Sequence, residues 1–448
     1  MTTGIFSLFV LLRLGVQEAE AFCGAYVGGA TSNGSSIVVL VRDGNTNTLT
    51  LVNDFSGAES TFGYIMPVPP SFSLSDVTTV DPAVIERLDA YSAPREVTYT
   101  CDDVLWTWSS EDDTGHWVGS TGGCGGDPTP EFVEDTSGGL KADNRGIHGD
   151  GSLSGVQTTQ RTTLGAYELQ VVQASGSDGL SAWLEDHGFE PSPLLTTRLA
   201  TYINGGQHFL VAQIHLDEIP VDARWLEPLR LRYDSPSISL PIWLGAASSV
   251  GVQDLLIFGI SRTESGALAI SNYPSANLED ECLTEDVNAT LNLNYDAFAA
   301  AEGEASWVSE FGWLGGKCDP CPENGALDPA DVALVGGESF APEEIYFTRL
   351  HLRYRPEQID EDLALYESGE AARWQSRYIS ASPEMSDFFP LCEGSSVSGW
   401  GECAPPDPPE TSSSSTPEEE PEGSGCACPG ASAAFLLGTL GFATRRRR

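Results

Sequence analysis

The chain has 448 residues, 40% of them hydrophobic, and its 65 acidic against 22 basic side chains give a formal net charge of -43 at pH 7. This length and apolar content suffice for one large packed domain or two ordinary ones. So acidic a surface repels phosphate backbones and anionic lipid headgroups, and we therefore expect no nucleic acid among the partners of the main body.

The N-terminal segment has the pattern of a signal peptide over residues 1–21. An apolar run at 5–14 is followed by Ala-Glu-Ala, a small-residue cleavage pattern that predicts cutting between Ala21 and Phe22. The basic segment that normally precedes such an apolar run is missing. The one arginine of this region, Arg13, lies inside the apolar run and not before it. We expect export, with signal peptidase as a processing partner.

Cysteine usage agrees with export. Eight of the ten cysteines precede the C-terminal tail, an even number compatible with four disulfide bridges, whose pairing the sequence leaves open. As a first hypothesis we pair close neighbours, Cys101 with Cys124 and Cys392 with Cys403. The eight are Cys23, Cys101, Cys124, Cys282, Cys318, Cys321, Cys392 and Cys403.

The first elements of the main domain are a hairpin and a helix. The β-rich runs Ile37–Val41 and Leu49–Val52 flank Asp-Gly-Asn at 43–45, a sequence suited to a hairpin turn. Further on, Asp81 stands where a helix N-cap is preferred and Pro82 at the first helical position. Apolar residues then recur on one side, which predicts a short amphipathic helix.

The rest of the main domain alternates between two kinds of pattern. Residues from about 102 to 160 are rich in Gly, Asp, Ser and Thr with little periodicity, which predicts a long loop. Beyond it, hydrophobic runs change repeatedly between period two and helical spacing. This predicts an α+β fold of mainly antiparallel strands with a few short helices. The segments "QIHLDEIP" and "RLHLRYRP" are similar to each other, which indicates two related halves as an alternative.

The C-terminal part divides into a spacer and a tail. After a main domain over 22–403, residues 404–425 are rich in Pro, Ser and Glu and predict an extended, solvated spacer. The tail, 426–448, holds an apolar stretch at 431–443 and four final arginines. As a helix that stretch is about 20 Å long, short of a hydrocarbon core of about 30 Å. Its shortness favours a removable signal over a permanent membrane span.

The tail has three parts in a fixed order, which are Gly-Cys-Ala-Cys at 425–428, a short apolar helix and an arginine cluster. In this order it resembles the tripartite MYXO-CTERM sorting signal of myxobacterial surface proteins. The resemblance implies recognition by a myxosortase-like protease, lipid attachment to Cys426 or Cys428, and passage to the outer membrane or cell surface. Cys426 is slightly favoured because a glycine precedes it. A retained weak membrane anchor is the alternative and predicts nearly the same location.

The main body carries a second resemblance. Segments such as "VLVRDGNTNTLTLVNDFSG", "YINGGQHFLVAQIHL" and "FTRLHLRYRPEQIDEDL" resemble successive parts of the bacterial domain of unknown function family 2330. The similarity runs in the same order from about Phe22 to about Pro390. It implies no activity and no catalytic residue.

No pattern typical of a hydrolase or a metal enzyme is present. Neither G-x-S-x-G nor H-E-x-x-H occurs. His215 and His351 lie in matching predicted strands, where a pair of site residues is one interpretation and hydrogen-bonded structural histidines are the favoured one. Cys318 and Cys321 form a C-x-x-C, but without a second pair or a nearby histidine a structural bridge is favoured over redox or zinc chemistry. We predict no metal and no cofactor.

The most site-like stretch is "CDDVLWTWSSEDDTGHWVGSTGGC". Trp106 and Trp108 share one face of a predicted strand and Trp117 can join them, a flat apolar platform of the kind used in sugar recognition. A small aromatic core under a loop is the favoured alternative. We therefore expect an exported, surface-anchored protein with a structural, adhesive or ligand-binding role and an unknown ligand. An envelope hydrolase or metal-dependent enzyme without a recognisable motif is the alternative.

Overall fold

The computed structural model describes residues 23–28, 35–55, 61–109, 116–121, 155–216, 219, 225–249, 251–278, 281–315, 317–318, 321, 327–380, 383–395 and 403–407. At 103, 105–109, 116–121, 342 and 383 it describes the backbone and not the side chains. Several expectations lie outside these residues, namely the signal peptide with Ala21 and Phe22, the partner cysteine Cys124, most of the spacer, and the tail with Cys426 and Cys428.

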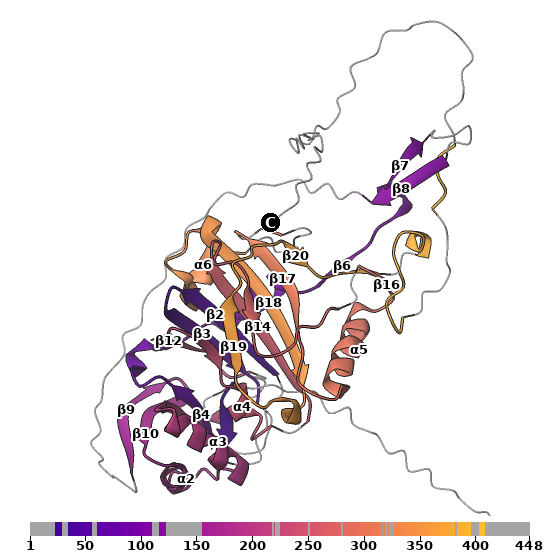
Figure 1. Cartoon of the computed structure of the whole chain (residues 1–448). Coiled ribbons are helices and arrows are strands. Elements are labelled where there is room, and N and C mark those ends of the chain that lie inside the picture. Colours follow the sequence, from indigo (N-terminus) through magenta and orange to yellow (C-terminus); the bar gives the residue numbers. More distant parts are fainter. Residues whose placement is uncertain are drawn as a thin grey trace, which may run out of the picture. The chain divides into compact units, whose positions relative to one another are not determined.

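The largest sheet has eight strands. In spatial order they are β20 (Trp374–Gln375), β17 (Trp307–Leu314), β18 (Ile345–Tyr354), β14 (Gln253–Arg262), β2 (Ser35–Asp43), β3 (Thr46–Asn53), β12 (Leu229–Asp234) and β5 (Val77–Thr79). Figure 1 shows its central strands β2, β3, β14, β17 and β18 side by side. Neighbouring strands are antiparallel except β14 and β2, which run parallel.

A second sheet has five antiparallel strands, in the order β1 (Ala25–Val27), β4 (Thr61–Val68), β11 (His208–His215), β10 (Tyr167–Ala174) and β9 (Val156–Leu164). The described residues also form one three-stranded antiparallel sheet, β13 (Ile238–Leu240), β19 (Leu363–Glu367) and β15 (Leu268–Ile270). Another three-stranded sheet is parallel, with β16 (Leu283–Thr284), β21 (Arg377–Ser380) and β6 (Arg95–Val97). The strands β7 (Val104–Ser109) and β8 (His116–Thr121) pair with each other.

The α-helices of the described residues are short. They are α1 (Pro82–Ser92), α2 (Ser177–Asp186), α3 (Pro193–Asn204), α4 (Ile242–Gly245), α5 (Val287–Ala300) and α6 (Pro329–Val332). Within the part of the chain that the structure describes, none of the helices has the length and apolar character needed to cross a membrane. The predicted α+β fold of mainly antiparallel strands with a few short helices is confirmed. The two related halves stay a prediction.

Strand β18 separates two environments. Side chains alternate between the two faces of a strand, and Leu350 and Leu352 point into a hydrophobic core that takes side chains from both large sheets. Arg349, His351 and Arg353 point to the other face, although every residue of the strand is buried. Three basic side chains in the interior of an acidic protein need charged partners there, and this face is therefore a candidate location for a site.

Local sequence rules predicted two elements correctly. Strands β2 and β3 pair around Gly44, whose positive φ of 59° is the conformation that glycine adopts without strain. Helix α1 begins at Pro82, and the Asp81 carboxylate accepts a hydrogen bond from the Ala83 amide at 2.9 Å. The hairpin and the capped helix are therefore confirmed.

The expected loop over about 102–160 differs from the structure. It holds both strands of the β7–β8 hairpin, and β9 begins inside it. The alternation of Trp106, Thr107, Trp108 and Ser109 in β7 is the pattern from which the strand with Trp106 and Trp108 on one face was predicted inside this range. The middle of the range lies outside the described residues.

The disulfides correct the neighbour pairing. Bridges join Cys101 to Cys403 and Cys282 to Cys392, so the predicted pairs Cys101 with Cys124 and Cys392 with Cys403 are wrong. The reason is long-range: Leu283 forms a parallel bridge with Leu391, which brings two distant cysteines together. A third bridge joins Cys318 to Cys321, and Cys23 is buried and forms no disulfide with another described cysteine.

Candidate functional site

Charged side chains gather on the face of the large sheet that α1 and α5 cover. On β18 they are Arg349, His351 and Arg353. Asp254 of β14 pairs with His351 and Arg353, and Glu310 of β17 pairs with Arg349 and His351. Only 2% of the Glu310 side chain is exposed, so this network, which we call the β18 charge network, belongs to the interior.

His351 is fixed between two carboxylates. Its Nδ1 lies 2.9 Å from Glu310 Oε1, and its Nε2 is hydrogen-bonded to Asp254 Oδ1. Burial lowers the pKa of His351, but the two carboxylates outweigh this effect and raise the pKa to about 9. At neutral pH the ring is therefore an imidazolium, which has no lone pair for general-base catalysis or for metal binding.

Glu310 is the centre of the network. Its carboxylate binds the Arg349 guanidinium and accepts a hydrogen bond from the Tyr295 hydroxyl of α5 at 2.5 Å. Burial by itself raises the pKa of Glu310, but Arg349 and His351 hold it well below its usual range. Arg349 in turn reaches Asp89 of α1 at 2.5 Å. Each charge has an opposite partner, which is the arrangement of a structural ion network.

The other sequence candidates are not brought to this network. His215 ends β11 in the five-stranded sheet, so it belongs to a different sheet from His351. In the β7–β8 hairpin, Trp108 lies opposite Trp117 and Trp106 opposite a glycine. The side chains of these tryptophans lie outside the described residues, so the aromatic platform stays a prediction.

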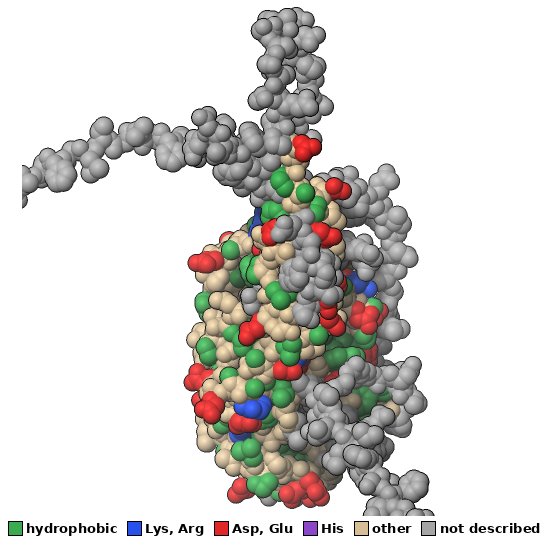
Figure 2. All heavy atoms as spheres, turned by 90° about the vertical axis from the view of Figure 1, so that its right-hand side faces the viewer, with side chains coloured by type: hydrophobic (Ala, Val, Ile, Leu, Met, Phe, Trp, Pro, Cys, Tyr) green, Lys and Arg blue, Asp and Glu red, His purple; other side chains and the backbone are tan. Residues whose placement is uncertain are grey.

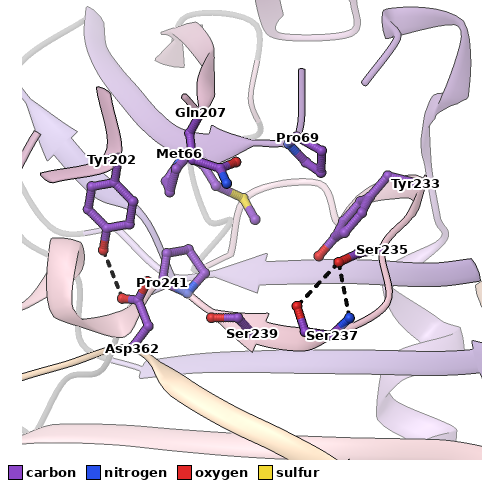
Figure 3. A pocket seen from close by; sticks show the side chains of 11 residues that line it. Met66, Pro69, Tyr202, Gln207, Tyr233, Ser235, Ser237, Ser239, Pro241 and Asp362 are labelled. Carbon is purple, nitrogen blue, oxygen red and sulfur yellow. Dashed lines mark hydrogen bonds between the residues drawn. The ribbon is translucent and has the colours of Figure 1, made fainter. Parts of the chain in front are cut away.

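A recess of about 140 Å³ lies elsewhere, between α3, the segment before β19 and the turn after β12 (Figure 3). We call it the Asp362 pocket. Its apolar wall comes from Met66 and three prolines, and its polar wall from tyrosine, glutamine, serine and aspartate side chains. Five of the polar members are Tyr202, Gln207, Tyr233, Ser239 and Asp362.

Asp362 is held by one carboxylate oxygen. Its Oδ1 accepts a hydrogen bond from the Tyr202 hydroxyl at 2.8 Å (Figure 3). The same oxygen accepts a hydrogen bond from the Trp243 amide of α4 at 3.2 Å. Burial raises the pKa of Asp362 to about 6, and these hydrogen bonds and the charge of Arg198 offset the effect only in part. Asp362 Oδ2 accepts no hydrogen bond from the described residues.

Arg198, whose charge lowers the pKa of Asp362, contacts Trp243 rather than the carboxylate. The Arg198 guanidinium lies 5.0 Å from the centroid of the Trp243 ring and donates a hydrogen bond to the Trp243 carbonyl. Among the described residues no basic side chain forms an ion pair with Asp362. The pocket therefore contains a recessed acid that interacts with Arg198 through its charge but has no direct ion-pair partner among the described residues.

Three further polar groups of the pocket are uncommitted. The Gln207 amide, the Tyr233 hydroxyl and the Ser239 hydroxyl make no side-chain hydrogen bond with another described residue, although all three line the recess. Gln207 and Tyr233 are partly buried and Ser239 is exposed, so each can bond to water or to a ligand. Together with Asp362 they give the recess several polar groups on its wall, as small-ligand sites have.

Sequence reasoning missed the Asp362 pocket. Asp362 lies in the acidic run "IDEDLAL", where nothing separates it from its exposed neighbours Asp360 and Glu361. The only local signal is the alternation of serines at 235, 237 and 239 ahead of a proline. No cluster of three or more His, Cys, Asp or Glu side chains suited to a metal ion occurs in the described part of the chain.

Comparison with known proteins gives a family and no ligand. A family model described as "Uncharacterized protein conserved in bacteria (DUF2330)" matches residues 17–366. This range contains the β18 charge network and the whole Asp362 pocket. No curated protein and no solved structure matches the chain.

Proposed function

The chain belongs to the bacterial DUF2330 family, and we propose that it is an exported, surface-anchored protein that binds a small organic cation in the Asp362 pocket. The observation that carries the binding proposal is the recessed carboxyl group of Asp362, which has one oxygen uncommitted and no ion-pair partner among the described residues. Charge, hydrogen bonding and size each support this choice of ligand.

Charge favours a cation. An ionised carboxylate in a recess loses part of its hydration, and a cation bound beside it restores that stabilisation. The whole molecule adds to this preference, because it has 65 acidic and 22 basic residues. On the face shown in Figure 2, acidic side chains are spread over the surface and basic ones are few. Such a field concentrates cations near the protein and repels anions.

Hydrogen bonding and size favour a small ammonium compound. A primary ammonium group donates hydrogen bonds, for which Asp362 Oδ2 is an acceptor, and the hydroxyls of Ser239 and Tyr233 further along the recess can bond to other polar atoms of a small ligand. A metal ion prefers several oxygen ligands with more than one carboxylate, whereas among the described residues Asp362 is the only acidic side chain that lines the recess. The volume of about 140 Å³ is below the roughly 300–1,000 Å³ of drug-sized sites.

The surface location rests on the two ends of the sequence. The signal-peptide pattern before Phe22, the acidic spacer and the MYXO-CTERM-like tail support export followed by processing at Cys426 or Cys428. Three bridges among the cysteines suit an oxidising compartment.

Mass spectrometry of the surface-fraction protein tests the location. We expect a mature chain that begins at Phe22, lacks the four final arginines and carries a lipid mass on a cysteine of the tail. A surface protein that still ends in the four arginines would contradict the sorting proposal. That result would leave the binding proposal untouched.

Ethanolamine is a suitable probe for the Asp362 pocket, because it combines a primary ammonium with one hydroxyl. Since only ionised Asp362 attracts the ammonium and its pKa is raised to about 6, the affinity should fall about tenfold between pH 8 and pH 5. Asp362→Asn keeps an oxygen for Tyr202 and Trp243 but removes the charge. We expect this variant to lose at least tenfold in affinity at pH 8 and to lose the pH dependence, measured by titration calorimetry.

Two controls make this experiment specific. Glu361→Gln removes the same charge from an exposed neighbour and should change the affinity less than twofold. Glycerol has a similar size and no charge, and it should bind at least tenfold more weakly than ethanolamine. Equal losses in the two variants, or glycerol binding as tightly as ethanolamine, would overturn the proposal.

A further inference from the structure

A second and larger recess follows the outer edge of β17. Its volume is about 470 Å³, and its lining comes from β17, from β20 and from the segment 275–278. We call it the β17 groove. It lies outside the Asp362 pocket and shares no lining residue with it.

The groove is a gap in the pairing of a sheet edge. At one end of β17, the Trp307 amide donates to the Pro274 carbonyl at 3.1 Å, and the Ala276 amide donates to the Trp307 carbonyl at 2.8 Å. Toward the other end, β20 pairs with β17 at Phe311 and Gly312. The groove lies along the stretch between these two contacts, so its walls are fixed by backbone pairing on both sides.

Two tryptophans line the groove and are held by their indole N–H groups. Trp374 Nε1 donates to the Ser309 carbonyl at 2.7 Å, and Trp307 Nε1 donates to the Tyr273 carbonyl at 2.9 Å. Trp374 is nevertheless 44% exposed. Because its polar edge is already bonded, the exposed part of Trp374 is an apolar aromatic surface with a fixed orientation.

Beside the aromatic rings lie small polar side chains. Ser275 and Asn277 are exposed, and Ser376 is fully buried at the groove. The Ser376 hydroxyl has no hydrogen-bond partner among the described residues. A buried hydroxyl without a partner is uncommon, and a ligand hydroxyl in the groove would satisfy it once the Ser376 side chain rotates toward the groove, because its Oγ is closed to solvent among the described residues.

The described lining of the groove is uncharged. Among the residues that the structure describes, no Asp, Glu, Lys, Arg or His side chain lines it, in a chain whose net charge is -43. An anionic ligand would meet the repulsion of the acidic protein and no cation among the described lining residues. A cation would find no carboxylate among them either. The groove therefore suits a neutral ligand with both apolar faces and hydroxyl groups.

We propose that the β17 groove binds one or two pyranose rings of a neutral glycan, with a sugar face against Trp374 and a sugar hydroxyl on Ser376. A pyranose ring combines an apolar C–H face with an equatorial belt of hydroxyls, which matches a fixed indole beside small polar groups. The volume of about 470 Å³ lies within the range of ordinary small-molecule sites. This inference goes beyond the cation proposal and does not depend on it.

Titration of the full chain with maltose, cellobiose and N,N′-diacetylchitobiose tests the proposal, with digalacturonic acid as the anionic comparison. We expect at least one neutral disaccharide to bind and to shift the tryptophan emission, and digalacturonic acid to bind at least tenfold more weakly. Trp374→Ala should weaken the neutral disaccharide at least tenfold, the loss typical of a central aromatic contact. Ser376→Ala should weaken it about threefold or more.

Tyr366→Ala is the matched control, because Tyr366 is 47% exposed and does not line the groove. It should leave the affinity within twofold of the unmodified protein, as should Asp362→Asn. Trp374→Phe keeps a ring and should retain part of the affinity, which separates loss of binding from loss of folding. Failure of all three neutral disaccharides, equal binding of digalacturonic acid, or equal losses in Trp374→Ala and Tyr366→Ala would each overturn the proposal.

Discussion

Replacing Glu310 with glutamine is expected to lower the free energy of unfolding by about 3–5 kcal/mol, the range for breaking a buried ion pair. The glutamine side chain still accepts the hydrogen bond from Tyr295, but the negative charge is gone. Arg349, with 7% of its side chain exposed, and His351, with 11%, then keep Asp89 and Asp254 but lose the carboxylate that they share. Their buried charges are left less fully compensated, which is the main cause of the loss.

Urea unfolding followed by circular dichroism measures this change. Glu338→Gln is the matched control, because Glu338 pairs with Arg232 at 3.0 Å while both side chains are more than half exposed. An exposed pair of this kind contributes about 0–1 kcal/mol. A Glu310→Gln variant no less stable than Glu338→Gln would show that the β18 charge network is not a structural ion network.

The elements that the sequence predicted well depend on residues close together in the chain. The β2–β3 hairpin needs Gly44 at one turn position, and α1 needs Asp81 directly before Pro82. Turn and capping preferences act over two to four residues, so such features can be read without knowledge of the fold. The alternation of apolar residues then predicted the β-rich fold class in the same local way.

The β18 charge network could not be predicted because it depends on a β-bulge. Ser309 lies opposite Leu350 and Phe311 opposite Arg349, so Glu310 is the extra residue of β17. A bulge redirects a side chain relative to the regular alternation of a strand, and here it turns Glu310 toward Arg349 and His351. Nothing in the segment "WVSEFGWL" marks the bulge.

The two proposed sites were hidden for a related reason. The Asp362 pocket takes side chains from β4, α3, β12, β13 and the segment before β19, and the β17 groove joins three segments. The sequence predicted an aromatic platform at Trp106, Trp108 and Trp117 because these residues are close neighbours along the chain. Trp307 and Trp374 are far apart in the chain, and they meet only through the pairing of β20 with β17.

The electrostatic contrast between the sites has a functional consequence. Among the described lining residues the Asp362 pocket has one acid and the β17 groove has no charged side chain, so we proposed a cation for the first and a neutral ring for the second. Raising the salt concentration screens charge and leaves apolar contact largely unchanged. Salt should therefore distinguish occupancy of the two sites when both ligands are present.

Removing the Cys282–Cys392 bridge is the second large effect that we expect. Both cysteines are buried, and the bridge joins positions separated by 110 residues. Closing a loop of this length lowers the conformational entropy of the unfolded chain. In the chain-entropy model this stabilises the folded protein by about 4–5 kcal/mol. The free energy of unfolding of the double variant Cys282→Ala with Cys392→Ala should therefore be about 4 kcal/mol lower than that of the unmodified protein.

The bridge between Cys318 and Cys321 provides the control. It closes a loop with a sequence separation of only 3, so Cys318→Ala with Cys321→Ala should cost less than about 2 kcal/mol on the same account. Urea unfolding of both double variants without reductant measures the two effects separately. A loss for the long loop no greater than for the short one would contradict the assignment of Cys282–Cys392 as the bridge that stabilises this part of the fold.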